Sequence, residues 1–132
     1  FHRAFDMTPD PNRALEDIID VGADRILTSG QANKAIDGME VLASIVRRAG
    51  NRINIMAGSG VNANNILKIM TYTHAREFHV SGRKLIESVM TYQNPKILMG
   101  GNPTVSEYEK YETDSECIKS LLQTVEKHFS SL

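Results

Sequence analysis

The sequence contains one cysteine, no tryptophan and no long apolar run among its 132 residues. A lone cysteine, Cys117, excludes an internal disulfide framework and fits a reducing compartment, so we expect a cytoplasmic protein. We expect no membrane partner, because no apolar run has the length of a bilayer span and no signal-peptide pattern is present. The net charge of −1 and the pI of about 6.5 give no electrostatic reason to expect nucleic acid as a partner.

The remaining composition is that of a globular domain. Hydrophobic residues make up 41% of the chain and charged residues 23%, both close to ordinary usage. The chain opens on Phe1, in a segment that already has the composition of a strand. A natural domain rarely begins inside a strand. We therefore expect residues 1–132 to be one piece of a longer domain.

Short β-rich segments recur at a regular period. They begin 24, 28 and 24 residues apart and cover Phe1–Phe5, Arg25–Thr28, Ile53–Ala57 and Glu77–Val80. Segments with helical periodicity follow the first three strands, with apolar positions at 14–19, 36–46 and 66–70. Asp10 and Pro11 predict the start of the first helix and Gly22 its end, whereas Asn62 or Asn64 is the expected cap of the third.

Alternating strands and helices predict parallel β/α units, because parallel neighbours need a crossover connection. A doubly wound sheet and a (β/α)8 barrel both satisfy this pattern. Short strands with polar residues near their carboxyl ends favour the barrel, whose chemistry lies on that rim. These polar residues are Asp6, Ser29, Ser59, His79 and Ser81.

Past Val80 the repeat stops. Turn signals at Asn94-Pro95, Gly100-Gly101 and Asn102-Pro103 predict loops across residues 91–113. Apolar residues then recur at helical spacing from Ile118 to Phe129, which predicts a final amphipathic helix.

The first candidate site comprises His2, Arg3 and Asp6 on the predicted first strand. A functional interpretation places them in a polar pocket that handles an anionic substrate. The alternative is a buried ion pair that fixes barrel register, Arg3 with Asp6 or with Glu77. Losing one partner of such a buried pair typically costs about 3–5 kcal/mol.

The second candidate is an anion site built from Gly58, Ser59 and Gly60, which follow a strand and precede a helix. Arg83 adds a cation from the turn after the next strand, and Ser29 is a further candidate from the preceding one. The alternative is a tight turn that needs glycine for its backbone conformation alone.

His79 is the third candidate, since alternation puts it on one face with Glu77. A histidine beside a carboxylate suits general acid–base catalysis, although a hydrogen-bonded core histidine is an equally good interpretation. Metal ligands are not identifiable: the chain has Cys117, six methionines and four histidines, but no Cys-x-x-Cys or Met-x-x-Met motif.

Four segments together resemble the strand motifs of the CutC family of copper homeostasis proteins. They are Phe1-His-Arg-Ala-Phe-Asp6, Arg25-Ile-Leu-Thr-Ser-Gly-Gln31, Ile55-Met-Ala-Gly-Ser-Gly-Val61 and Glu77-Phe-His79. The resemblance implies that the chain is the C-terminal half of a TIM-type (β/α)8 barrel, with four β/α units and a C-terminal helix. It also implies a cytoplasmic homo-oligomer that binds copper ion in its intact form.

The sequence is therefore consistent with three functions. The first is a CutC-like protein of copper homeostasis. The second is a barrel enzyme acting on a small anionic or phosphorylated substrate, with His2, Arg3, Asp6 and His79 in its pocket. The third is an oligomeric structural module with a vestigial site.

Overall fold

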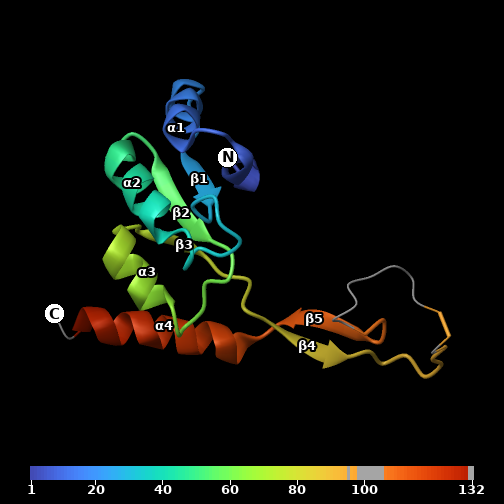
Figure 1. Ribbon diagram of the computed structural model, residues 1–132. Coiled ribbons are helices and arrows are strands. Elements are labelled where there is room, and N and C mark those ends of the chain that lie inside the picture. The colour runs from blue at the N-terminus through green and yellow to red at the C-terminus, as the bar shows by residue number, and fades with distance from the viewer. Residues whose placement is uncertain (95, 98–105, 131–132) are drawn as a thin grey trace.

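Three parallel strands form the central sheet: β1 (Arg25–Thr28), β2 (Asn54–Gly58) and β3 (Glu77–His79). Figure 1 shows them in a computed structural model that describes residues 1–94, 96–97 and 106–130. Their order in the sheet is their order in the chain, and Leu27, Met56 and Glu77 lie side by side in the register. Three of the predicted strands are thus confirmed, two of them with ends displaced by one residue.

Helices α1 (Pro11–Asp20), α2 (Met39–Ala49) and α3 (Ile66–Thr73) lie in one layer beside the sheet (Figure 1). The predicted start of α1 is confirmed, because the Asp10 carboxylate accepts from the backbone N–H groups of Asn12 and Arg13 at 2.9 and 3.2 Å. Its end is confirmed as well, since Gly22 has a φ of +79° and donates to the carbonyl of Ile19.

The starts of α2 and α3 differ from the predictions. Ile36 lies outside α2, which begins at Met39. Neither Asn62 nor Asn64 caps α3: the capping position is Asn65, which makes no side-chain cap bond. The asparagines instead bond to one another's backbone, since Asn62 Oδ1 accepts from Asn64 N and Asn65 Oδ1 accepts from Asn62 N. They form a turn before the helix, which is the competing use of such side chains.

The core lies between the sheet and this layer of helices. Alternate strand residues point into it, among them Ile26, Thr28, Ile55 and Ala57, all buried. They meet Phe5, Leu15, Ile18, Leu42, Ile45 and Ile69. The opposite face carries Leu27, Met56 and Glu77, each half-buried, and exposed His79. None of the described helices lies over this open face (Figure 1).

The predicted first strand, Phe1–Phe5, is wrong. Phe1 does lie beside β1, donating to the carbonyl of Arg25 at 2.6 Å and accepting from Leu27 N at 2.9 Å. From Arg3 the chain turns into a short 3₁₀ helix, η1 (Arg3–Met7). A 3₁₀ helix brings residues i and i+3 together, so Arg3 and Asp6 share a side that strand alternation would have separated.

A two-stranded antiparallel ribbon, β4 (Arg83–Glu87) with β5 (Glu109–Thr113), follows β3 and projects away from the sheet (Figure 1). The predicted loop across residues 91–113 is therefore wrong at Glu109–Thr113. The predicted turns at Gly100-Gly101 and Asn102-Pro103 lie outside the described residues. Pro95, the second residue of the predicted Asn94-Pro95 turn, also lies outside them.

Helix α4 (Ser115–Ser130) confirms the predicted final helix and packs against α3. It also packs against the root of the ribbon, which is Gly82, the residue before β4; Gly82 has a φ of +50°. A Cβ at that position would lie 2.0 Å from Cδ1 of Ile118, so the close approach of α4 requires glycine there. No helix among the described residues is both long and apolar enough to cross a membrane.

Candidate functional site

The carboxylate of Asp6 is the centre of a polar cluster at the carboxyl end of β1. Its side chain is only 7% exposed. Oδ1 accepts from Thr28 Oγ1 at 2.5 Å and from Gln31 N at 3.1 Å. Oδ2 accepts from Arg3 Nε at 2.7 Å, while Ser29 approaches through both its Oγ and its N. Five donor groups therefore converge on one carboxylate and tie η1 to the loop that follows β1.

Arg3 is the partly exposed member of the cluster, with 42% of its side chain accessible. Its Nη2 donates to Ser29 Oγ at 2.8 Å and to the Ala32 carbonyl at 3.2 Å. Of the two predicted partners it pairs with Asp6, whereas Glu77 pairs with Arg25 at 2.9 Å. The guanidinium is thus held in one orientation, with part of its surface toward solvent.

These contacts decide the ionisation of Asp6. Burial by itself raises the pKa of this carboxyl, but hydrogen bonds from Thr28, Arg3, Gln31 and Ser29 outweigh burial. The net result is a pKa below the ordinary value of 3.8. Asp6 is therefore a permanent anion near neutral pH and a poor general base. It acts as an acceptor that fixes Arg3 and Ser29 in place.

The predicted glycine turn follows β2 at the same edge of the sheet, because all three strands are parallel. Ser59 and Gly60 both have positive φ, 79° and 70°. Ser59 Oγ donates to the Asn33 carbonyl at 2.7 Å, and the Ser59 carbonyl accepts from Ala35 N at 2.9 Å. Residues 61–65 separate this turn from α3, so the helix does not begin directly behind it.

Three residues that were not predicted as site residues support the loops after β1 and β2. Lys34 lies against Gly60, with side-chain carbons 3.2–3.4 Å from where a Cβ would stand. Gln31 Nε2 donates to the Thr8 carbonyl at 2.6 Å. Thr28 is the last residue of β1 and directly precedes Ser29. A hydroxyl at the last residue of a parallel strand is the one signal that could have identified Thr28.

The two histidines predicted as site residues, His2 and His79, lie in different parts of the fold. His2 is exposed, stacks on Phe1 at 5.2 Å and accepts from Ala4 N through Nδ1 at 3.0 Å. His79 lies on the open face beside Gly58, whose Cβ position would be 3.2 Å from the His79 Cβ. The predicted shared face of His79 and Glu77 follows from the β2–β3 register. The Glu77 carboxylate, however, is engaged by Arg25.

Arg83 is not part of this cluster. It lies on β4, where its guanidinium stacks over the Tyr111 ring at 4.3 Å from the centroid. The structure therefore brings together Arg3, Asp6 and Ser29, and separately His79 and Gly58, while Arg83 belongs to the ribbon.

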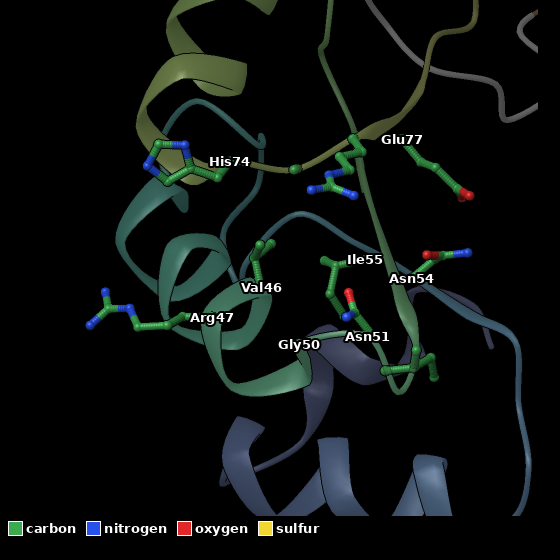
Figure 2. A pocket seen from close by; sticks show the side chains of 11 residues that line it. Val46, Arg47, Gly50, Asn51, Asn54, Ile55, His74 and Glu77 are labelled. Carbon is green, nitrogen blue, oxygen red and sulfur yellow. The ribbon is translucent and has the colours of Figure 1, made fainter.

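A cleft of about 370 Å³ lies at the opposite edge of the sheet (Figure 2). It is bounded by the first residues of two strands, Asn54 and Glu77, and by the ends of α2 and α3 at Gly50 and His74. The labelled Arg47 side chain points away from Asn54 and Glu77. None of the predicted site residues lines this cleft, so it is separate from the Asp6 cluster.

Histidine, cysteine and carboxylate side chains are not gathered into a metal site in the described part of the chain. No group of three or more histidine, cysteine, aspartate or glutamate side chains there could hold a metal ion. Cys117 is half-buried on α4, and Met56 is half-buried on the open face of the sheet. Copper(I) prefers soft sulfur ligands in one coordination sphere. The described residues do not fit such a site by themselves.

Comparison with known proteins is consistent with these features. The sequence profile of the CutC family matches residues 1–84. A protein from Parabacteroides distasonis, named family protein CutC, is 48% identical over 121 residues, which cover 92% of this chain and 50% of that protein. A Bacteroides fragilis protein of the same name is 47% identical over 125 residues, covering 95% of this chain and 50% of its own. The chain spans about half the length of these curated relatives.

A solved structure is similar as well. It is the crystal structure of a Streptococcus agalactiae protein provisionally named copper homeostasis protein CutC, with a TM-score of 0.56 and 35% identity. The match covers 60% of this chain and 40% of that one.

Proposed function

Because this chain belongs to the CutC family, we propose that it forms the C-terminal half of a (β/α)8 barrel that acts in copper homeostasis. The observation that carries the proposal is the one-sided sheet. Strands β1, β2 and β3 follow one another in order, and α2 and α3 are the crossovers between them. Right-handed crossovers in a constant direction put every helix on the same face, whereas a doubly wound sheet reverses direction and covers both.

The open face supports the same conclusion. A barrel is a sheet closed on itself, with helices outside and side chains filling the interior. Leu27, Met56, Glu77 and His79 point to the side that no described helix covers. This chain spans about half of its relatives' length, so a second set of β/α units is the natural partner for that face. Residues 1–132 are then one half of a single barrel domain.

Copper is proposed for the intact barrel and not for this half alone. Cys117 lies on α4 and Met56 on the open face of the sheet, so their sulfur atoms come from different layers of the fold. Thiolate and thioether ligands placed in this way do not converge on one ion. Any copper that the 132-residue chain holds should therefore be weakly bound.

Anaerobic copper(I) titration against a competing chelator tests this proposal. The samples are the 132-residue chain, its Cys117→Ser variant, and the chain co-expressed with the half of the Parabacteroides distasonis relative that it does not match. We expect the two halves to copurify one-to-one and to bind copper tightly, while the chain alone does not compete with the chelator. Tight one-to-one binding by the chain alone, unchanged by Cys117→Ser, would contradict the assignment of copper to the intact barrel.

A second function, a barrel enzyme acting on a small anionic substrate, is favoured by one specific observation. The Arg3 guanidinium is held by Asp6 and Ser29 at the carboxyl edge of the sheet, yet 42% of its side chain remains accessible. Arginine in a fixed orientation suits carboxylate or phosphate recognition. In this proposal Ser29, Gly58, Ser59 and Gly60 line the same mouth, with His2 and His79 at its rim.

Inorganic phosphate is the probe for that second function. Phosphate should raise the thermal midpoint of the copurified complex and have a much smaller effect on its Arg3→Met variant. Arg13→Met is the matched control, since Arg13 lies on α1 with 82% of its side chain exposed. An equal phosphate effect on both variants would contradict an anion site at Arg3. A complex that binds neither copper nor phosphate would support the structural module.

A further inference from the structure

The β4–β5 ribbon is mostly exposed. Leu85 and Tyr111, which face one another across it, are 38% and 50% accessible. The ribbon pairs with no other strand among the described residues. An isolated hairpin is marginally stable in water, and its unpaired edges are templates for another strand.

The backbone bonds of the ribbon show which groups face outward from β4. Ser88 N donates to the Tyr108 carbonyl at 2.6 Å, and Asp114 N donates to the Gly82 carbonyl at 2.7 Å. Even-numbered residues of β4 therefore face β5 in this antiparallel ladder. The N–H and C=O groups of Arg83, Leu85 and Glu87 point to the free edge.

The side chains on this edge carry two charges without an ionic partner in one chain. Arg83 and Glu87 lie on the same face of β4, two residues either side of Leu85. Neither makes an ion pair within the part of the chain that the structure describes. Glu87 is also directly opposite Glu109, a like-charge pair that weakens the ribbon.

We propose that the free edge of β4 pairs antiparallel with β4 of a second copy of this chain, forming a four-stranded sheet about a two-fold axis. With Leu85 opposite Leu85 of the second copy, the outward backbone groups bond reciprocally. Each Arg83 then lies opposite Glu87 of the other copy, which adds a cation beside the Glu87–Glu109 pair. Arg83 reaches the seam by rotating its long side chain away from Tyr111.

The other edge of the ribbon is a poorer candidate. On β5 two of the three charges are already joined, because Lys110 Nζ lies 2.7 Å from Glu112 Oε1. A contact of β4 with β5 of another copy would be heterologous, that is, it would join two different surfaces. Heterologous contacts add further copies to an open filament unless the rotation between copies closes a ring. The β4–β4 seam is self-complementary and closes at two copies.

Charge reversal tests the seam. In a dimer of Arg83→Glu, an acidic side chain at position 83 lies opposite Glu87 of the other copy, and this happens twice. In a dimer of Glu87→Arg, a basic side chain at position 87 lies opposite Arg83 of the other copy, again twice. Each variant alone should weaken dimerisation of the 132-residue chain by about tenfold or more in sedimentation equilibrium. An equimolar mixture restores both opposite-charge pairs and should form heterodimers as tight as the wild-type dimer. Lys110→Glu, on the opposite edge, is the control and should leave the dimer unchanged.

Hydrogen exchange gives a second readout that does not depend on a variant. The Leu85 amide points outward and should become protected as protein concentration rises, whereas the Ile86 amide faces β5 and should be protected throughout. Association through the open face of the sheet would leave the Leu85 amide unprotected, and that outcome would overturn the proposal. So would a wild-type chain that stays monomeric, or a mixture that fails to restore the dimer.

Discussion

Replacing Asp6 by asparagine tests whether the polar cluster at the end of β1 holds that part of the fold together. The substitution keeps the size of the side chain and one acceptor oxygen. That oxygen can still accept from Thr28 and Gln31 in the position of Oδ1. The new amide NH₂ then occupies the position of Oδ2, where it meets Arg3 Nε, another donor, at 2.7 Å.

The size of the effect follows from these contacts. Asp6→Asn removes the charge-assisted bond to Arg3 and an acceptor for Ser29, a residue with no exposed surface. Bonds to charged groups contribute roughly 1.5–3 kcal/mol each, so we expect a loss of about 3 kcal/mol in the free energy of unfolding. Arg3→Met should cost less, about 1 kcal/mol, because Arg3 is 42% exposed and water can replace it. Because Arg3 is partly exposed, the stability cost of Arg3→Met should be smaller than the roughly 3–5 kcal/mol that is typical of losing one partner of a fully buried ion pair.

Urea denaturation followed by circular dichroism measures both variants, and the double variant completes a mutant cycle. The coupling energy between Arg3 and Asp6 should account for most of the Arg3→Met effect. A loss under about 1 kcal/mol for Asp6→Asn, or one smaller than that of Arg3→Met, would refute the reasoning that Asp6 is the organising acceptor.

Two further predictions concern other parts of the fold. Hydrogen bonds from Arg52 and Arg48 lower the pKa of Glu16 from its ordinary 4.5 to about 2, so its contribution to stability is present above pH 4.5 and lost as pH falls toward 2. Glu16→Gln should therefore flatten the decline in stability between these pH values; an unchanged acid titration would contradict the pairing. Gly82→Ala should destabilise the junction of the ribbon with α4 by roughly 1–2 kcal/mol more than Gly22→Ala, measured by urea denaturation. Both glycines have positive φ, but only Gly82 is packed against Ile118, so equal losses would show that packing is not involved.

Local features of the sequence were sufficient to predict the repeating body of the fold. The strand Arg25–Thr28 was placed correctly because Ile26, Leu27 and Thr28 form a short β-rich run, and α1 because Asp10-Pro11 is a local capping signal. Phe1–Phe5 has strand composition too, but its conformation depends on hydrogen bonds between Asp6 and residues 28–31. Such long-range contacts cannot be predicted from local composition. The pairing of Arg3 with Asp6 was one of two alternatives, and only the fold separates them.

The ribbon was missed for a different reason. Arg83–Glu87 and Glu109–Thr113 are rich in charge and lie either side of a long connection with strong turn signals. Leu85 and Ile86 are adjacent and Tyr111 stands among charged residues, so the period-two pattern that predicts a half-buried strand is absent. The structure specifies this pairing through cross-strand contacts, among them Arg83 over Tyr111.

The root of the ribbon has a consequence for how the domain tolerates change in length. Because Asp114 N bonds to the Gly82 carbonyl at 2.7 Å, the chain leaves the body of the fold and returns to it at nearly the same point. Strands β4 and β5 are therefore an excursion from the connection between β3 and α4. We therefore expect changes in the length of this excursion to leave the flanking strand and helix in place. The match to the CutC profile ends at residue 84, just inside this excursion.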